Sequence, residues 1–207
     1  MSIKSRKRMN LRIVLMMSLI ALIMLPLTAC RFRFWEPLAP QRSFTPEDLL
    51  IDQEIVPPGW ELTDPTFAAG DTLCTTECTT RGFTVSDDEN PVRYGRHDVY
   101  RYRSTGIAQR TFEKVYLSAT RLQTSLNGWT YQSQIAERSH FGCHNMAGNV
   151  GLYCEWGAQY EEYIVVFGAR LSSDGSSLAG IEQIEEIVRA IDARMAEYLG
   201  KPLESGD

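Results

Sequence analysis

The sequence has none of the short motifs on which common hydrolases depend, and it has few histidines. It contains neither the G-x-S-x-G of serine hydrolases nor the H-E-x-x-H of zinc peptidases. His97 and Asp98 are neighbours on an expected strand, so their side chains would point to opposite faces and could not form a catalytic dyad. For the same reason, the side chains of Glu161 and Glu162 would point to opposite faces. We therefore expect a protein that is not an enzyme and has no catalytic residue, with a hydrolase as the least favoured alternative.

Redox and metal-binding motifs are also missing. Three residues separate Cys74 from Cys78, whereas a redox C-x-x-C motif has two. The acidic stretch 87–90 lacks the D-x-D-x-D-G order of a calcium loop. The H-x2-C-H cluster and the later cysteine in residues 140–154 do not form the two close ligand pairs of a typical zinc site. The sequence thus predicts no metal and no cofactor.

Positive charge is scarce beyond the N-terminus. The chain has 21 basic and 26 acidic residues, a formal charge of −5. Five of those basic residues precede residue 30, so 16 basic residues face 26 acidic ones in the rest of the chain, a formal charge of −10. An acidic domain is not expected to bind nucleic acid or to carry a polybasic membrane-binding surface.

The strongest positive signal is an export segment. Residues 1–12 carry five positive charges and no acid, and the 17 residues of 13–29 are almost wholly apolar. A membrane-spanning helix needs about 20 apolar residues, and Pro26 interrupts this run. The run ends in Leu27-Thr28-Ala29-Cys30, which resembles the lipobox of bacterial lipoproteins. An uncleaved anchor and an ordinary signal peptide are the alternatives.

The lipobox resemblance implies a location and a domain plan. It implies that signal peptidase II removes residues 1–29 and that the thiol of Cys30 carries diacylglycerol, whose two chains hold the protein on a membrane. Arg31 in the second position favours the outer membrane in a two-membrane host; otherwise the outer face of the cell membrane is expected. Residues 30–43 are then a lipid-anchored tether, 44–201 a single domain and 202–207 a tail.

The other four cysteines predict disulfides, because an exported chain meets an oxidising environment. Cys143 and Cys154 lie at equal distances from Gly148-Asn149, so a hairpin turning there would place them opposite each other. We therefore favour the pairs Cys143–Cys154 and Cys74–Cys78. The rival pairing, which would tie the earlier cysteines to the hairpin, stays open.

Apolar periodicity predicts two long amphipathic helices and one short helix. The short helix begins at Thr45 and stops before residues 57–59. The first long helix covers 107–122, and the second follows residue 178 and ends at Gly200.

The rest of the chain predicts strands and loops. The expected strands are 97–103, 129–135, the two arms that carry Cys143 and Cys154, and 160–171, whereas 70–91 is expected to be a loop. Strands joined by short turns are antiparallel, and amphipathic helices need a sheet to cover. The predicted fold is therefore α+β, with an antiparallel sheet of about four to five strands packed by two helices.

Residues 45–200 resemble a class of extracytoplasmic modules. A helix with the step Ala108-x-x-x-Phe112, strands with Cys143 and Cys154, and a closing helix resemble the sensor domain of PknH-type kinases and its lipoprotein relatives, and more loosely the Mog1/PsbP-like fold. The resemblance implies a module that binds something beyond the membrane.

These observations favour a membrane-anchored, non-catalytic ligand-binding or sensor module. A scaffold or interaction subunit of a cell-envelope complex is the alternative; the partner would be a small ligand or an envelope protein. We expect a ligand cleft between the sheet and the helix that starts near Ser104, where Tyr100, Arg101 and Arg103 would contact an anion.

Overall fold

The computed structural model describes residues 36–67, 71–85, 94–117, 129–145, 152–171 and 180–203. The chain divides into two compact units, Met1–Pro37 and Leu38–Asp207. The predicted signal peptide, the lipobox and Cys30 lie outside the described residues.

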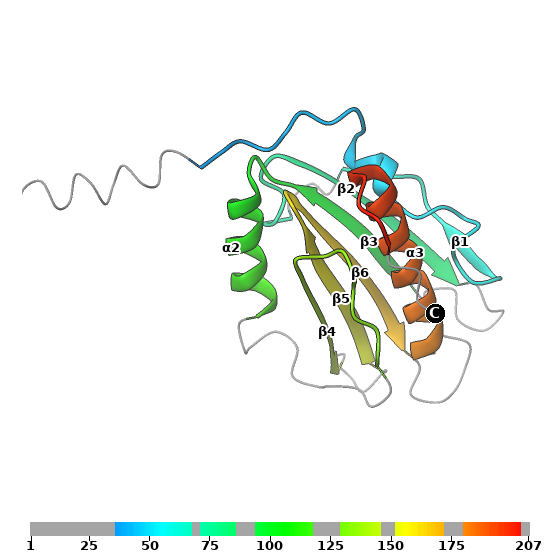
Figure 1. Cartoon of the computed structure of the whole chain (residues 1–207). Helices are drawn as coiled ribbons and strands as arrows, with labels where there is room; N and C mark the ends of the chain where they lie inside the picture. Colours follow the sequence, from blue (N-terminus) through cyan, green and yellow to red (C-terminus); the bar gives the residue numbers. More distant parts are fainter. Residues whose placement is uncertain are drawn as a thin grey trace, which may run out of the picture. The chain divides into compact units, whose positions relative to one another are not determined.

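The described residues of the second unit form a six-stranded antiparallel sheet, in the order β1-β2-β3-β6-β5-β4 (Figure 1). The α+β prediction is confirmed, but the predicted number of four to five strands was too small. The strands are β1 (Trp60–Leu62), β2 (Glu77–Val85), β3 (Tyr94–Arg101), β4 (Arg138–Asn145), β5 (Leu152–Tyr160) and β6 (Tyr163–Leu171).

Strand β2 occupies part of the predicted loop 70–91, so that prediction was wrong for residues 77–85. Its core-facing positions include Thr79 and Arg81, which are not apolar, and Phe83 is the one large apolar residue among them. Arg81 fits this position because its Nη1 donates to the Ile51 carbonyl oxygen at 2.7 Å. The strand therefore lacks the apolar alternation by which half-buried strands are recognised.

The predicted strand 129–135 is not a strand. Its backbone donors are satisfied by a side chain instead, since Glu185 Oε1 accepts from the N–H groups of Thr130 and Tyr131 at 2.7 and 3.2 Å. Asp192 accepts from Ser133 Oγ at 2.8 Å and from the hydroxyl of Tyr131. Helix-borne carboxylates thus take the place of a neighbouring strand.

The predicted strand 160–171 is divided by a tight turn at Glu161 and Glu162, between β5 and β6. Glu161 has a φ of 51°, in the left-handed region, and its N–H donates to Glu137 Oε2 at 2.7 Å. The two glutamates therefore do not point to opposite faces of one strand; both contact the guanidinium of Arg42.

The sheet separates two hydrophobic cores (Figure 1). Helix α3 (Ile181–Leu199) and the 3-10 helix η1 (Pro46–Leu49) cover one face, where strand residues such as Val99, Val165 and Trp156 are buried. Helix α2 (Thr105–Tyr116) packs on the other face against Tyr100, Ile164 and Val166. The sheet is thus the middle of three layers.

Residues predicted to begin or end helices do so at three positions, Thr45, Ser104 and Gly200. Thr45 precedes η1, and its N–H and hydroxyl both donate to Asp48 Oδ2. Ser104 caps α2 by accepting from the Ile107 N–H at 3.2 Å, and the helix covers Thr105–Tyr116. The last part of the predicted helix, 118–122, lies outside the described residues. Gly200, with a φ of 64°, ends α3 as predicted.

An aromatic stack runs across the sheet on the α3 face. Trp60, Phe83 and Phe167 stack with ring centroids 4.7 and 5.3 Å apart. Gly95 lies on β3 beneath this stack, where a Cβ atom would come within 2.1 Å of the Phe83 ring. A glycine is therefore required at this position.

Candidate functional site

The two disulfides are Cys74–Cys78 and Cys143–Cys154, the pairs that the sequence favours. Cys143 and Cys154 are direct partners on β4 and β5, with Cα atoms 4.0 Å apart, which is typical of a non-hydrogen-bonded pair. Cys74 and Cys78 close a loop at the start of β2. Both bonds are typical of an oxidising, extracytoplasmic environment.

The structure does not form an anion site from Tyr100, Arg101 and Arg103. Tyr100 is completely buried and its hydroxyl donates to Asp71 Oδ2 at 2.6 Å. Arg101 lies on the other face of β3, where it contacts Glu77 at 3.2 Å, and the Arg103 side chain is exposed. The predicted cleft between the sheet and α2 is filled by a core that includes Tyr102, Ala108, Phe112 and Tyr116.

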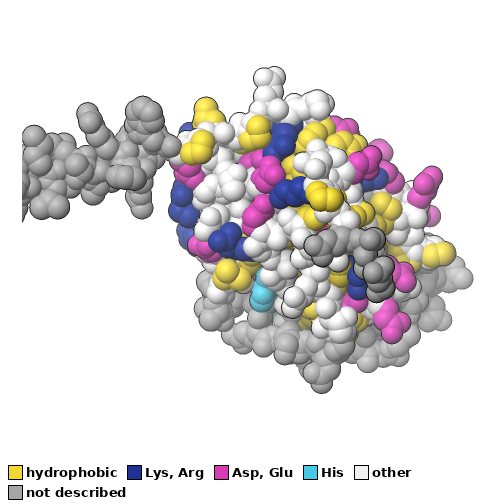
Figure 2. All heavy atoms as spheres, viewed as in Figure 1, with side chains coloured by type: hydrophobic (Ala, Val, Ile, Leu, Met, Phe, Trp, Pro, Cys, Tyr) yellow, Lys and Arg dark blue, Asp and Glu magenta, His cyan; other side chains and the backbone are white. Residues whose placement is uncertain are grey.

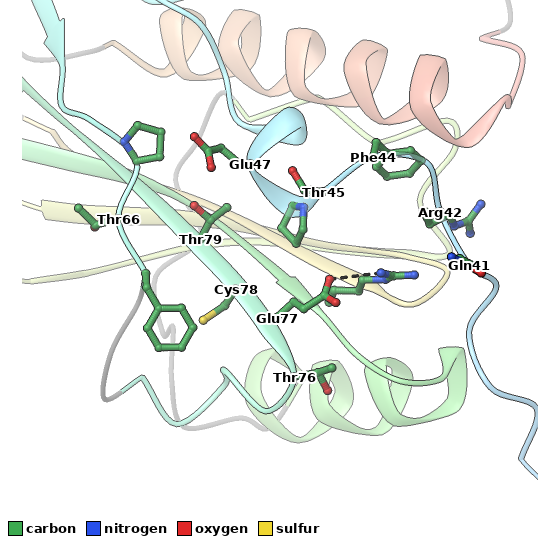
Figure 3. Close-up of a pocket in the computed structure, with 14 residues that line it drawn as sticks. Gln41, Arg42, Phe44, Thr45, Glu47, Thr66, Thr76, Glu77, Cys78 and Thr79 are labelled. Carbon is green, nitrogen blue, oxygen red and sulfur yellow. Dashed lines mark hydrogen bonds and ion pairs between the residues drawn. The ribbon is translucent and has the colours of Figure 1, made fainter.

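A groove lies instead on the opposite side of the sheet, along the first residues of β2 (Figure 3). Residues 76–79 and Arg101 line it from the sheet side, 41–47 form one wall and 65–67 the other. Its volume is about 740 Å³, within the range of roughly 300–1,000 Å³ typical of ligand pockets. The size is therefore sufficient for a small molecule or for a few residues of a peptide.

Glu47 and Thr66 stand toward one end of the groove, Gln41 and Arg42 toward the other, with Glu77 between them (Figure 3). At its η1 end, the wall made by 41–47 is held by the hydrogen bonds that the N–H and hydroxyl of Thr45 donate to Asp48. In the opposite wall, Phe67 is 66% exposed, which is unusual for a phenylalanine and offers an apolar surface to a ligand. The groove therefore combines an apolar contact with charged ends.

The arginines of the groove are already paired. Arg42 donates from Nε and Nη2 to the two carboxylate oxygens of Glu162, both at 2.9 Å, and Glu162 has no exposed surface. This bidentate hydrogen bond, opposed by partial burial and helped by Glu161, holds the pKa of the Arg42 guanidinium above its ordinary value. Arg101 also contacts Glu162, at 3.8 Å, and it donates to the Pro40 carbonyl oxygen at 2.8 Å.

The carboxylates of the groove are more available than its arginines. The Glu77 side chain is 49% exposed beside Arg101, and Glu47 is exposed with no ion-pair partner in the described ranges. Over the face seen in Figure 2, acidic and basic side chains are interspersed. The groove is thus better suited to a neutral or cationic group than to the anion expected from the sequence.

A second polar cluster lies on the α2 face of the sheet, around Asp98. The carboxylate lies 2.9 Å from Arg96 Nε and accepts from Thr80 Oγ1. Burial raises the pKa of Asp98, against the lowering effects of Arg96 and Thr80. Burial also raises the pKa of Tyr153, whose charged neighbours are Glu155 and Arg96. Arg96 and Thr80 therefore hold the Asp98 carboxylate in place, which is typical of a structural network.

His97 is the one histidine that the fold buries completely. Its Nδ1 accepts from the Ile51 N–H at 3.1 Å, whereas its Nε2 has no hydrogen-bond partner within the described part of the chain. Burial, together with the charges of Arg194 and Arg81, lowers its pKa to about 3. The ring is therefore neutral near pH 7 and supports the chain that follows η1.

The side chains of the H-x2-C-H cluster, residues 140–144, do not come together at one place. Cys143 points to the α3 face and is in a disulfide, whereas His140 and His144 alternate to the other face of β4. Among the described residues, no three His, Cys, Asp or Glu side chains gather in a way that could hold a metal ion. Within the same ranges, no helix is both long and apolar enough to cross a membrane.

Comparison of the chain with protein-family models, with curated proteins and with solved structures found no match. The groove was missed at the sequence level because its walls come from segments with no pattern of their own. The one available signal was Phe67, the only aromatic residue in the stretch 61–67. The interpretation of the site therefore rests on its own geometry.

Proposed function

We propose that this chain is an extracytoplasmic lipoprotein, anchored through Cys30, whose α+β domain binds a ligand in the groove beside β2 without catalysing a reaction. The observation that carries the proposal is the groove itself, about 740 Å³ in volume, with Phe67 exposed in its wall. The lipobox-like Leu27-Thr28-Ala29-Cys30 and the two disulfides support the location.

The ligand is a neutral or cationic molecule with an apolar part. Arg42 and Arg101 are occupied by Glu161, Glu162 and Glu77, so they are not free to bind an anion. Glu47 and the exposed part of Glu77 provide acceptors for an amine or amide.

The binding proposal is tested on protein extracted from cells in mild detergent. Native mass spectrometry identifies the molecule that co-purifies, and its affinity is then measured with Phe67→Ala and Glu47→Gln variants. Each variant loses about tenfold in affinity, because each removes one contact worth about 1.4 kcal/mol. Leu117→Ala is the matched control, since Leu117 is also exposed but follows α2 on the opposite face of the sheet. Unchanged affinity in both groove variants would contradict the proposal.

The same experiment distinguishes binding of a small ligand from the alternative, a scaffold or interaction subunit. If the groove retains a segment of an envelope protein, and the two groove variants release it, the domain is an interaction subunit that uses the same surface.

The anchor is tested separately by metabolic labelling with palmitate. Wild-type protein incorporates the label and Cys30→Ser does not. Label that persists in the Cys30→Ser variant would contradict lipidation at this residue.

A further inference from the structure

The N-terminal segment of the domain is fastened to one end of the sheet. The N–H of Ala39 donates to the Arg103 carbonyl oxygen at 2.8 Å, and Arg101 donates to the Pro40 carbonyl oxygen at 2.8 Å. Arg42 forms the bidentate contact with Glu162 in the β5–β6 turn. We call the surface formed by residues 38–42, 101–105 and 161–162 the anchor-side end.

These contacts fix where the chain enters the domain. Arg42, Arg101 and Glu162 are largely or fully buried, with side-chain exposures of 15%, 16% and 0%. Ala39, Pro40 and Arg42, which fall within the predicted tether, thus make contacts inside the compact unit that begins at Leu38. The first of these contacts along the chain is made by Ala39.

The remaining tether has a short reach. Nine residue-to-residue steps lead from Cys30 to Ala39. Whatever conformation they take, they span at most about 32 Å. Helix α3 is about as long, since its 19 residues rise about 28 Å. A lipid on Cys30 would thus hold the anchor-side end at a distance from the bilayer no greater than about the length of α3.

The exposed groups of the anchor-side end suit a lipid interface. Leu38 is 78% exposed, and the exposed Arg103 side chain has no ion-pair partner within the described ranges. The carboxylates of Glu161 and Glu162, which would repel lipid phosphates, are paired with Arg42. The preceding sequence, residues 31–35, has two arginines and three aromatic residues, which favour the headgroup region.

We propose that the anchor-side end faces the bilayer, with Leu38 and Arg103 at the headgroups, so that the domain stands on the membrane in one orientation. This inference rests on the proposed lipidation of Cys30. Gln41 and Arg42, which belong to the anchor-side end, also line the groove. The groove therefore opens close to the membrane surface, and its ligand is one that is present there.

The test measures energy transfer from the protein to the membrane. Full-length lipidated protein is reconstituted into vesicles of phosphatidylethanolamine and phosphatidylglycerol that contain a rhodamine-labelled lipid. A donor dye is attached through a genetically encoded azide at Thr105, at the anchor-side end, or at Glu182, at the start of α3. Both residues are exposed. Transfer from position 105 is expected to exceed transfer from position 182 by about twofold or more, because the length of α3 separates the two ends.

Two further measurements make the test specific. Insertion of twenty Gly/Ser residues between Glu36 and Pro37 leaves the domain intact and should remove at least half of the difference. If the wild-type protein floats with the vesicles but transfer is equal at the two positions, or greater at 182, the proposed orientation is wrong. The proposed lipid anchor would still stand. Wild-type protein that fails to float would overturn both the orientation and the proposed lipid anchor.

Discussion

At the residue scale, His97 makes the stability of the domain dependent on pH. Its folded-state pKa is about 3, whereas the pKa of an unfolded histidine is about 6.5. As pH falls below 6.5, the unfolded state binds a proton that the folded state does not bind. The contribution of the neutral His97 to the free energy of unfolding is therefore fully present above pH 6.5 and is lost as pH falls toward 3.

A His97→Asn variant tests this effect. Asparagine keeps an acceptor near the position of Nδ1 for the Ile51 N–H but cannot be protonated in this range. The free energy of unfolding of the wild type should fall by about 1.4 kcal/mol per pH unit relative to the variant between pH 6 and 4. Urea unfolding at several pH values measures the difference. Comparison with the variant cancels the contribution of Asp98, whose raised pKa acts in the opposite direction. Parallel pH profiles for the two proteins would show that His97 is not responsible.

At the element scale, α3 holds the segment 129–136 through two carboxylates. Glu185 accepts the N–H groups of Thr130 and Tyr131, and Asp192, which is 1% exposed, accepts three hydroxyl groups. These are the hydroxyls of Tyr131, Ser133 and Tyr160. The polar groups of the segment are therefore held mainly by the helix, whereas Trp129 also stacks on Phe141 of β4, with ring centroids 3.9 Å apart.

Glu185→Ala should release this segment locally. Hydrogen exchange at the amides of Thr130 and Tyr131 is expected to accelerate about tenfold, since each loses a charge-assisted hydrogen bond worth about 1.5 kcal/mol. NMR measures the exchange. Glu182→Ala, an exposed position on the same helix, should leave both amides unchanged. Equal protection in the two variants would mean that other contacts hold the segment.

The two disulfides contribute to stability according to the length of chain that each one closes. Cys143–Cys154 has a sequence separation of 11 and Cys74–Cys78 one of 4. Replacing each pair by serine is expected to lower the free energy of unfolding by about 3 and about 2 kcal/mol, respectively. Thermal and urea unfolding give the values. A greater loss from the Cys74/Cys78 pair would show that this bond supports β2 as well as its own loop.

The elements that could be predicted from the sequence are those whose stability comes from apolar periodicity. Both long helices, β3, the β4–β5 hairpin and β6 belong to this group. Strand β2 could not be predicted because Thr79 and Arg81 occupy its core-facing positions. The segment 129–135 alternates like a strand, but distant carboxylates satisfy its donors. The groove could not be predicted because its walls meet only in the folded chain.

At the scale of the whole molecule, residues 38–42 are part of the folded domain. A chain that begins at Glu36 should be more stable than one that begins at Ser43 by about 2 kcal/mol, because the shorter chain leaves the buried Glu162 without its bidentate partner. Urea unfolding compares the two. Arg42→Gln in the longer chain should reproduce most of the loss. Equal stability of the two chains would place residues 38–42 outside the cooperative unit.

The position of the Cys143–Cys154 bond has a consequence for self-association. Among the strands that the structure describes, β4 is at one edge of the sheet and pairs only with β5, so the bond links this edge strand to its inner neighbour. An edge strand that can detach is the usual starting point for strand exchange between copies of a protein. While the two sulfurs are joined, β4 cannot leave its place to complete the sheet of another molecule. Reductive conditions would therefore allow swapped dimers that oxidising conditions prevent.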